Sequence, residues 1–306
     1  MRRGTCVPIT IDLLFRGQPG VVAAYLLTSP GRAALVETGP SSTLPALLAG
    51  IERAGVALES IREVLVTHVH LDHSGAAGLL LRHLPNATLY AHERGVQHLI
   101  NPAKLVSSAA RIYGSLMGPF WGEVLPVPAE RLVALRDGDT VRAAGHELEV
   151  LYTPGHASHH VAFRLEDDSV FTGDVGGIRL PDCAYVRPPT PPPDLDLELW
   201  DASIDRLAAI DAPAFYPTHF GCCEDTAAHL RELRARLRTW EALVLDGLRG
   251  GQDRAAIAAS MRGQEDVALL AAAGPDAVIR YETAGSYAMN VSGYERYLRK
   301  RHLDLG

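Results

Sequence analysis

This 306-residue sequence has few cysteines and no long apolar run. Its four cysteines are scattered, with Cys222 and Cys223 adjacent, which excludes a disulfide framework and is typical of a reduced cytoplasmic protein. No apolar run approaches the ~20 residues of a membrane-spanning helix. The N-terminus also lacks the apolar core and cleavage site of a signal peptide. We therefore expect a soluble, cytoplasmic protein that has no membrane partner.

An excess of basic charge is missing as well. The sequence has 29 Lys and Arg against 36 Asp and Glu, a formal net charge of −7, and therefore no electrostatic footprint for nucleic acid. Hydrophobic residues make up 47% and charged residues 21%, which is ordinary for a globular protein with a sizeable core. A small molecule is the expected substrate.

Strand-like and helical segments alternate up to about residue 222. Strands are expected in three runs within 9–37, at 61–67 and 87–92, in four runs within 131–174, and at 213–219. Helices are expected at 42–54, at 74–84 with Ser74 as N-cap, within 93–122, and at 195–209. The proline-rich segment 187–194 is either a linker or a semi-rigid wall beside the active site.

Histidines and aspartates gather where apolar strands end. The segment "THVHLDHSG" follows a buried strand, and "VLYTPGH", "SVFTGD" and "FYPTH" end three later apolar runs. Loops at strand ends are where a rigid sheet can position ligands. The candidate metal ligands are His68, His70, Asp72, His73, His156, Asp174 and His219. Seven ligands exceed one tetrahedral site, so they predict two adjacent metal ions with one bridging carboxylate.

The HxHxDH motif, followed by a single His, an Asp and a final His, resembles the metallo-β-lactamase-fold hydrolases over about residues 9–221. The resemblance implies an α+β fold, a four-layer αββα sandwich with metals at one edge. It assigns His68, His70 and His156 to one metal, Asp72, His73 and His219 to the second, and Asp174 to the bridge. Two divalent ions are expected, zinc first, although iron or manganese suits the same ligands. Glu37 stands where the family often has Asp, and is expected to stabilise the turn or support the ligands.

The almost entirely helical pattern from Glu224 onward places a domain boundary near 222–224, and the resemblance implies a reaction. Residues 1–222 would form the catalytic domain and 223–306 a helical extension, which covers the sandwich, caps the metal edge with Tyr287, Met289 and Tyr294, or forms a dimer surface. A metal-bridging hydroxide would attack a small ester, thioester or lactone, with Asp72 as the catalytic residue that orients water and moves its proton. Lactonase-like members fit best, because the Cys-Gly-Arg motif of glyoxalase II-like thioesterases is missing after Asp174.

Two other reactions stay open on this scaffold. A mononuclear non-haem iron enzyme resembling persulfide dioxygenases would use His68, His156 and Asp174, and a phosphodiesterase would use both metals. For the substrate pocket we expect Tyr185 and Arg187 to bind a leaving oxygen or a carboxylate. An apolar wall for an acyl chain is expected from Tyr113, Met117, Phe120 and Trp121. Simple packing is the alternative for all six. His159 and His160 would either support the ligands or begin a strand.

Overall fold

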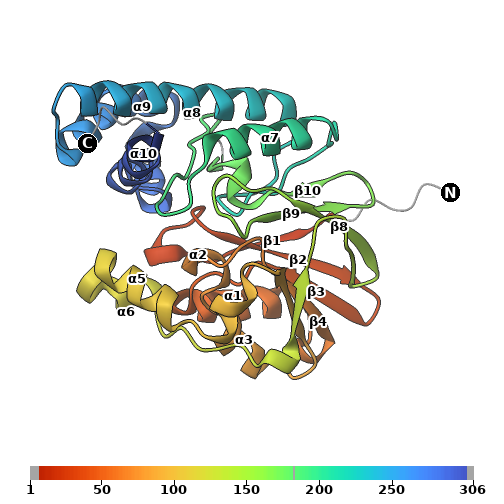
Figure 1. The fold of residues 1–306 in the computed structure, drawn as a ribbon. Helices are drawn as coiled ribbons and strands as arrows, with labels where there is room; N and C mark the ends of the chain where they lie inside the picture. The colour runs from red at the N-terminus through yellow and green to blue at the C-terminus, as the bar shows by residue number, and fades with distance from the viewer. Residues whose placement is uncertain (1–6, 182, 302–306) are drawn as a thin grey trace.

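The computed structural model describes residues 7–181 and 183–301, so Cys6 lies outside it. Ten strands form two sheets that pack face to face (Figure 1). The first sheet has the order β1-β2-β3-β4-β5-β6, antiparallel from β1 to β3 and parallel from β3 to β6. Its strands are β1 (Ile9–Asp12), β2 (Ala23–Ser29), β3 (Arg32–Val36), β4 (Ile61–Leu65), β5 (Thr88–His92) and β6 (Leu132–Leu135).

The second sheet is antiparallel, with the order β10-β9-β8-β7. Its strands are β7 (Thr140–Ala143), β8 (His146–Tyr152), β9 (Val161–Leu165) and β10 (Val170–Phe171). Alternate residues of both sheets point into one shared core, where Tyr25 of β2 packs on Phe171 of β10 with ring centroids 5.4 Å apart. The inner two layers are therefore sheet against sheet.

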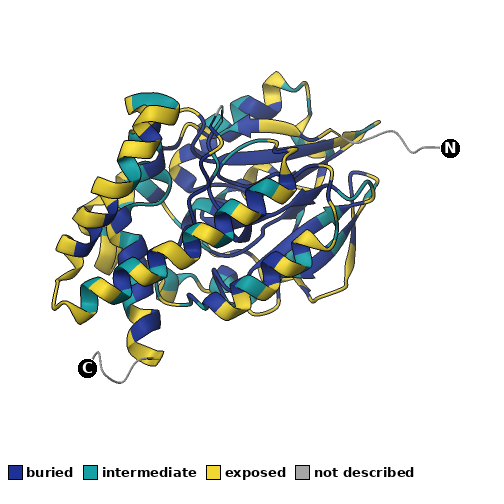
Figure 2. Ribbon diagram, turned by 90° about the horizontal axis from the view of Figure 1, so that it is seen from above, coloured by how far each residue is buried: buried dark blue, intermediate teal, exposed yellow. Residues whose placement is uncertain are grey.

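Helices cover the outer face of each sheet. Apolar residues of α1 (Leu44–Arg53) and α3 (Ala77–His83) pack on the first sheet, and those of α7 (Leu197–Ala208) and α8 (Thr226–Arg249) pack on the second. Figure 2 shows buried residues concentrated along the strands and on the inward faces of these helices. The predicted αββα sandwich is confirmed.

Shorter helices and 3₁₀ turns lie in the connections that follow individual strands. They are α2 (Leu71–Ser74), α4 (Val96–Ile100), α5 (Ala103–Tyr113) and α6 (Met117–Trp121), together with the 3₁₀ turns η1 (Phe15–Gly17), η2 (Ser41–Thr43) and η6 (Gly173–Gly176). In Figure 1, α5 and α6 lie below the gap that separates them from the C-terminal helices.

The C-terminal part is helical, with α8 followed by α9 (Arg254–Ala284) and α10 (Tyr287–Arg301). Within α9 the backbone turns at Gly274, whose φ is +77°, immediately before Pro275. Trp240 of α8 and Tyr294 of α10 belong to the same apolar cluster as residues of the second sheet. The helices therefore pack directly on the sandwich. None of the helices that the structure describes is long and apolar enough to cross a membrane.

Three expected elements differ in the structure. The helix expected to begin at Ser74 begins at Leu71, because the extended backbone of His70 starts the turn α2, and α3 follows only at Ala77. Residues 131–174 hold five strands instead of four. The segment 213–219 is not a strand, since Phe215 makes only isolated bridges beside β10.

Candidate metal centre

Four chain segments bring the expected ligands to one edge of the sandwich. β4 leads into Thr67 and His68, and α2 carries Asp72 and His73 directly after it. The loop between β8 and β9 supplies His156, η6 after β10 supplies Asp174, and the segment beyond Phe215 supplies His219. All seven predicted ligands meet there, in three overlapping groups whose ligand atoms lie within 4.8 Å of one another.

Three imidazoles form the first group. His70 Nδ1 lies 2.9 Å from both His68 Nε2 and His156 Nε2, and those two nitrogens are 3.2 Å apart. Nitrogens on a shared tetrahedral cation, each about 2.0–2.1 Å from it, would lie roughly this close together. The group therefore matches one metal site.

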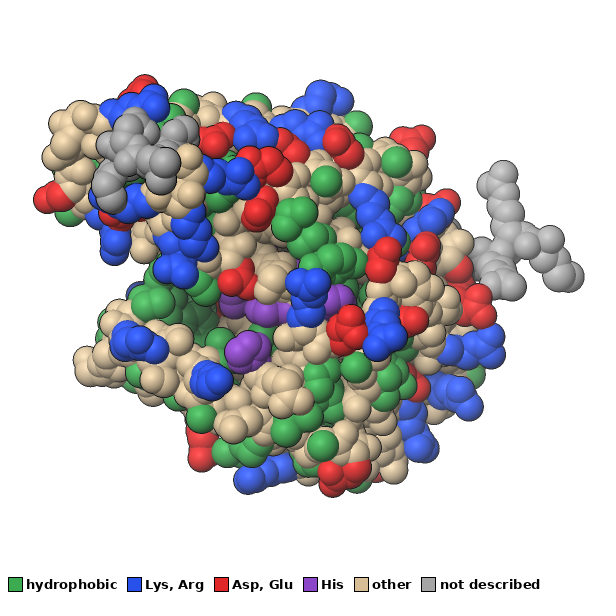
Figure 3. Space-filling view, in the orientation of Figure 1, with side chains coloured by type: hydrophobic (Ala, Val, Ile, Leu, Met, Phe, Trp, Pro, Cys, Tyr) green, Lys and Arg blue, Asp and Glu red, His purple; other side chains and the backbone are tan. Residues whose placement is uncertain are grey.

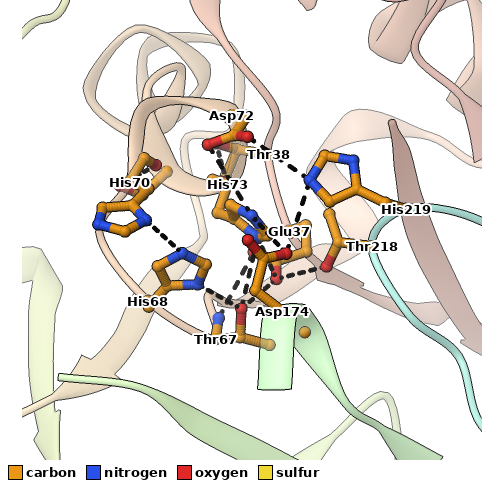
Figure 4. Close-up of polar contacts among 12 residues, drawn as sticks. Glu37, Thr38, Thr67, His68, His70, Asp72, His73, Asp174, Thr218 and His219 are labelled. Carbon is orange, nitrogen blue, oxygen red and sulfur yellow. Dashed lines mark hydrogen bonds and ion pairs between the residues drawn. The ribbon is translucent and has the colours of Figure 1, made fainter. Parts of the chain in front are cut away.

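Asp174 connects this group to the second one. Its Oδ2 lies 3.4 Å from His156 Nε2, whereas its Oδ1 lies 3.2 Å from His73 Nε2 and 3.5 Å from His219 Nε2. Asp72 Oδ2 is 3.5 Å from His219 Nε2 and completes the second group. Each oxygen of one carboxylate therefore faces a different set of histidines, as a bridging ligand does. Figure 4 shows Asp174 beside His73 and His219.

The tautomers of four histidines follow from their neighbours. In each, Nδ1 has an acceptor in the protein, so the proton sits there and the lone pair of Nε2 points to the centre. The acceptors are the hydroxyl of Thr67 for His68 at 3.1 Å, the carboxylate of Glu37 for His73 at 3.1 Å, the carbonyl of Pro189 for His156 at 2.8 Å, and the carbonyl of Val21 for His219 at 2.8 Å.

Three inward atoms remain without a hydrogen bond to any residue of 7–181 or 183–301: His73 Nε2, His219 Nε2 and Asp174 Oδ1. Buried polar atoms are nearly always paired, because leaving one unpaired is costly. A cation would satisfy all three lone-pair donors at once. Five imidazoles and two carboxylates are also the donor types that zinc and similar ions prefer. The residues present fit two divalent cations.

Burial and neighbouring charges shift the pKa values of the ligand side chains. Burial lowers the pKa of His70 to about 4, with the His156 imidazole adding to the effect, so this ring is neutral at pH 7. Burial opposes ionisation of Asp72, but His73 and His219 lower its pKa to about 2. Burial also works against protonation of His73, yet Asp174 and Glu37 raise its pKa above the ordinary value. A cation would take the place of that proton, because metal binding releases protons from its ligands.

Glu37 supports the second group of metal ligands through hydrogen bonds. Its side chain is 1% exposed, and its Oε1 accepts hydrogen bonds from Thr67 Oγ1 at 2.5 Å, Thr218 Oγ1 at 3.1 Å and His73 Nδ1 at 3.1 Å (Figure 4). Its φ of +71° is unusual for a residue with a side chain, and such backbone strain clusters at functional sites. The two threonines were not singled out from sequence, although each precedes a ligand histidine in "VTH" and "PTH".

His160 is a supporting residue as well. It is fully buried, its Nδ1 lies 2.9 Å from Thr153 Oγ1, and its Nε2 accepts from the backbone N–H of Val175 at 3.3 Å. It therefore fixes the turn η6 that carries Asp174. His159 lies beside His70, with ring centroids 5.6 Å apart, and β9 begins only at Val161.

A cavity of about 410 Å³ opens above the metal edge, with His70, Asp72 and Asp174 at its floor. Figure 3 shows the histidines at the base of a hollow between the C-terminal helices and the α5–α6 segment. Of the expected apolar wall, Tyr113, Phe120 and Trp121 line the cavity and Met117 does not. Its other walls are α5, the proline-rich segment (Pro189 and 191–193), the α9–α10 junction (282–286, Met289 and Asn290) and the turn at Phe15 and Arg16.

Two expected substrate contacts are misplaced. Neither Tyr185 nor Arg187 is among the described residues that line the cavity. The hydroxyl of Tyr185 donates to Glu265 at 2.5 Å. Arg187 is fully buried and donates to the Tyr287 hydroxyl at 2.6 Å and to the Gly285 carbonyl at 3.2 Å. Their segment passes beneath α9, so both side chains tie the sandwich to the C-terminal helices.

Of the three expected lid residues, Met289 alone lines the cavity. Tyr287 and Tyr294 are only 1% and 0% exposed, because both side chains point toward α8. They belong to the apolar cluster that the C-terminal helices share with the second sheet. Arg16, Phe15 and the carboxylate of Glu282 also line the cavity and were not anticipated. No local sequence pattern singles them out.

Comparison with known proteins agrees with this geometry. Residues 17–219 match the family model described as the metallo-beta-lactamase superfamily. The metallo-beta-lactamase fold-containing protein ST1585 of Sulfurisphaera tokodaii is 23% identical over 253 residues, 80% of this chain and 91% of that protein. Thioesterase pkgB of Emericella nidulans is 29% identical over 52% of this chain, which spans only 34% of that relative.

Among solved structures, the metallo-beta-lactamase family protein TTHA1429 of Thermus thermophilus superposes with a TM-score of 0.69. It is 24% identical, and the match covers 96% of this chain and 93% of that one. The shared fold, the matched segment and the convergent ligands lead to one conclusion. The chain belongs to the metallo-beta-lactamase superfamily and is a metal-dependent hydrolase.

Proposed function

We propose that this hydrolase holds two divalent cations, zinc in the first place, and cleaves a small ester, thioester or lactone with an apolar acyl group. The position of Asp174 carries the proposal, because its two oxygens face two separate groups of histidines at the floor of a cavity. Iron or manganese would suit the same donors. The substrate size follows from the cavity, whose volume is typical of small-molecule sites.

Cations bound by these ligands would lower the pKa of water and polarise a carbonyl oxygen. The carboxylate of Asp72 can accept the proton that this water releases. Its carboxylate lines the cavity floor, is 20% exposed, and stays ionised because His73 and His219 hold its pKa near 2. A carboxylate oxygen there can orient water and accept its proton as the carbonyl is attacked.

The walls determine which substrates fit. Tyr113, Phe120 and Trp121 form an aromatic face, and Pro191 and Pro192 add a stiff apolar part of the lining. Such a lining would exclude water from the acyl group. A thioester is consistent with the name of thioesterase pkgB, although this chain spans about a third of that protein.

Elemental analysis of the purified protein tests the metal content, and a substrate panel tests the reaction. We expect two zinc ions per chain and turnover of 4-nitrophenyl hexanoate, a hexanoyl thioester or a hexanoyl lactone. Asp72→Asn should lower kcat by about 10²–10⁴-fold, whereas Asp246→Asn, on the exposed side of α8, serves as the control. One iron per chain with oxygen uptake would favour the dioxygenase-like alternative, and cleavage of only bis(4-nitrophenyl) phosphate would favour a phosphodiesterase.

A further inference from the structure

The turn η1 places a cationic side chain, that of Arg16, on one wall of the cavity. Among the described residues that line the cavity, Arg16 is the only arginine or lysine. Within the described part of the chain its guanidinium makes neither a hydrogen bond nor an ion pair. The carboxylate of Glu282, which also lines the cavity, is already bound to Arg262 at 2.8 Å. The charge of Arg16 is therefore available to a ligand.

The guanidinium of Arg16 is held on an aromatic platform. Its central carbon lies 4.0 Å from the centroid of the Phe120 ring, a stacked arrangement that leaves the N–H groups at its edge free to donate. The carbonyl of Phe120 accepts from Ser42 Oγ at 2.6 Å, and Trp121 stacks on Phe15 with centroids 5.4 Å apart. The platform is therefore fixed from two sides.

The backbone beneath Arg16 is strained. Leu14 and Arg16 both have left-handed φ values, +51° and +56°, which residues with side chains seldom adopt. Asp12 maintains this turn, since its Oδ1 accepts from the N–H of Leu14 at 3.0 Å and its Oδ2 from the N–H of Gly20 at 2.8 Å. Strain that the surroundings enforce in this way concentrates at ligand-binding positions.

Tyr113 supplies a second donor on the same wall. Its ring lies 6.3 Å from Phe120 and 5.0 Å from Trp121, and its hydroxyl makes no hydrogen bond to any residue of the described chain. Tyr113 lines the same cavity as Asp72 and Arg16. Burial raises the pKa of its phenol, so the hydroxyl is protonated and can donate a hydrogen bond.

We infer that Arg16, assisted by Tyr113, binds an anionic oxygen group of the substrate. This deepens and rests on the proposed function: the substrate class would be an ester, thioester or lactone with an apolar body and a carboxylate remote from the reacting carbonyl. A planar guanidinium matches a carboxylate with two parallel hydrogen bonds, and a neighbouring hydroxyl adds a third. The apolar lining of α5, including Leu105 and Ile112, would contact the carbon chain between them.

Calorimetric titration of the metal-loaded protein tests this site without turnover. The probes are 1-octanesulfonate, whose anionic head is a weak metal ligand, and the uncharged methyl octyl sulfone of similar shape. We expect the sulfonate to bind at least tenfold more tightly than the sulfone. Arg16→Gln should reduce this preference to about one, and Tyr113→Phe should reduce it several-fold. Arg82→Gln, an exposed arginine of α3 outside the cavity, should preserve it.

The outcomes separate this inference from the proposed function. Equal binding of the two probes to the unaltered protein, or a preference that survives Arg16→Gln, would overturn the role of Arg16 even if neutral esters are hydrolysed. A preference that depends on Arg16, in a protein that hydrolyses none of the panel, would support the anion site and contradict the proposed reaction. Circular dichroism of Arg16→Gln excludes misfolding as the cause of any loss.

Discussion

Replacing Glu37 by Gln is the sharpest test of how the second group of ligands is held. The substitution keeps the size of the side chain but removes its charge and turns one oxygen into a donor. Oε1 accepts from Thr67, Thr218 and His73, and Oε2 faces the N–H of Thr67 at 3.4 Å. In either orientation the amide therefore places its NH₂ group against at least one donor.

The magnitude follows from these contacts. Hydrogen bonds to a charged group contribute about 1.5–3 kcal/mol, and a buried group left unpaired costs a similar amount, so we expect a loss of roughly 3 kcal/mol. For a chain of this size that corresponds to a fall in Tm of roughly 5 °C. His73 also loses the acceptor that fixes its tautomer, which should weaken binding of the second metal ion about 10–100-fold.

Competition with a chromogenic chelator gives the two metal affinities, and differential scanning calorimetry gives the Tm. The matched control is Glu52→Gln on the exposed face of α1, which should change neither quantity. The first ion should bind almost as before, because the hydrogen bonds of Glu37 go to Thr67, Thr218 and His73 and not to His68, His70 or His156. If Glu37→Gln binds both ions with unaltered affinity and keeps its Tm, the proposed support of His73 is wrong.

Three further predictions address the metals, the contact between the sandwich and the C-terminal helices, and the proline-rich wall. Removal of metal with EDTA should lower the free energy of unfolding by about 2.7 kcal/mol for each bound ion, relative to protein at a metal concentration 100-fold above Kd. His156→Ala should remove the contribution of the first ion, as measured by calorimetry. Burial opposes ionisation of Glu265, but bonds from Tyr185 and Trp240 lower its pKa. The ionised Glu265 carboxylate therefore stabilises the fold fully above its unfolded-state pKa near 4.5, and this stabilisation is lost as the pH falls through the lower pKa of the folded state. The difference in Tm between the unaltered protein and Glu265→Gln should shrink between pH 7 and pH 4. Gly293→Ala should lower the free energy of unfolding by about 1–3 kcal/mol and reduce turnover, because the added Cβ would collide with the carbonyl of Thr190 in the proline-rich wall. The control Gly263→Ala, with open space around its Cβ, should stabilise α9 slightly.

The ligand set could be predicted from the sequence because each ligand is tied to a local pattern. An apolar strand followed by a short polar turn has few ways to fold, and its last residue must lie at the sheet edge. The sequence therefore indicates His68, His156 and Asp174 separately, each after its own apolar strand. The spacing of His70, Asp72 and His73 then places these residues on the turn that follows His68. The arrangement of the strands in two sheets with covering helices was implied by the family resemblance and not by these local patterns.

Outside the bulky segment of Tyr113, Phe120 and Trp121, residues of the substrate cavity follow no such local pattern. Tyr185 and Arg187 are close to Asp174 in sequence, yet the chain carries them beneath α9 and away from the cavity. Arg16 and Phe120 are far apart in sequence and carry no motif, but the packing of η1 on α6 stacks them. Local sequence determines where a strand ends and which side chain it presents. Only the tertiary structure decides which distant side chains share a wall, because that depends on how layers pack and not on any one segment.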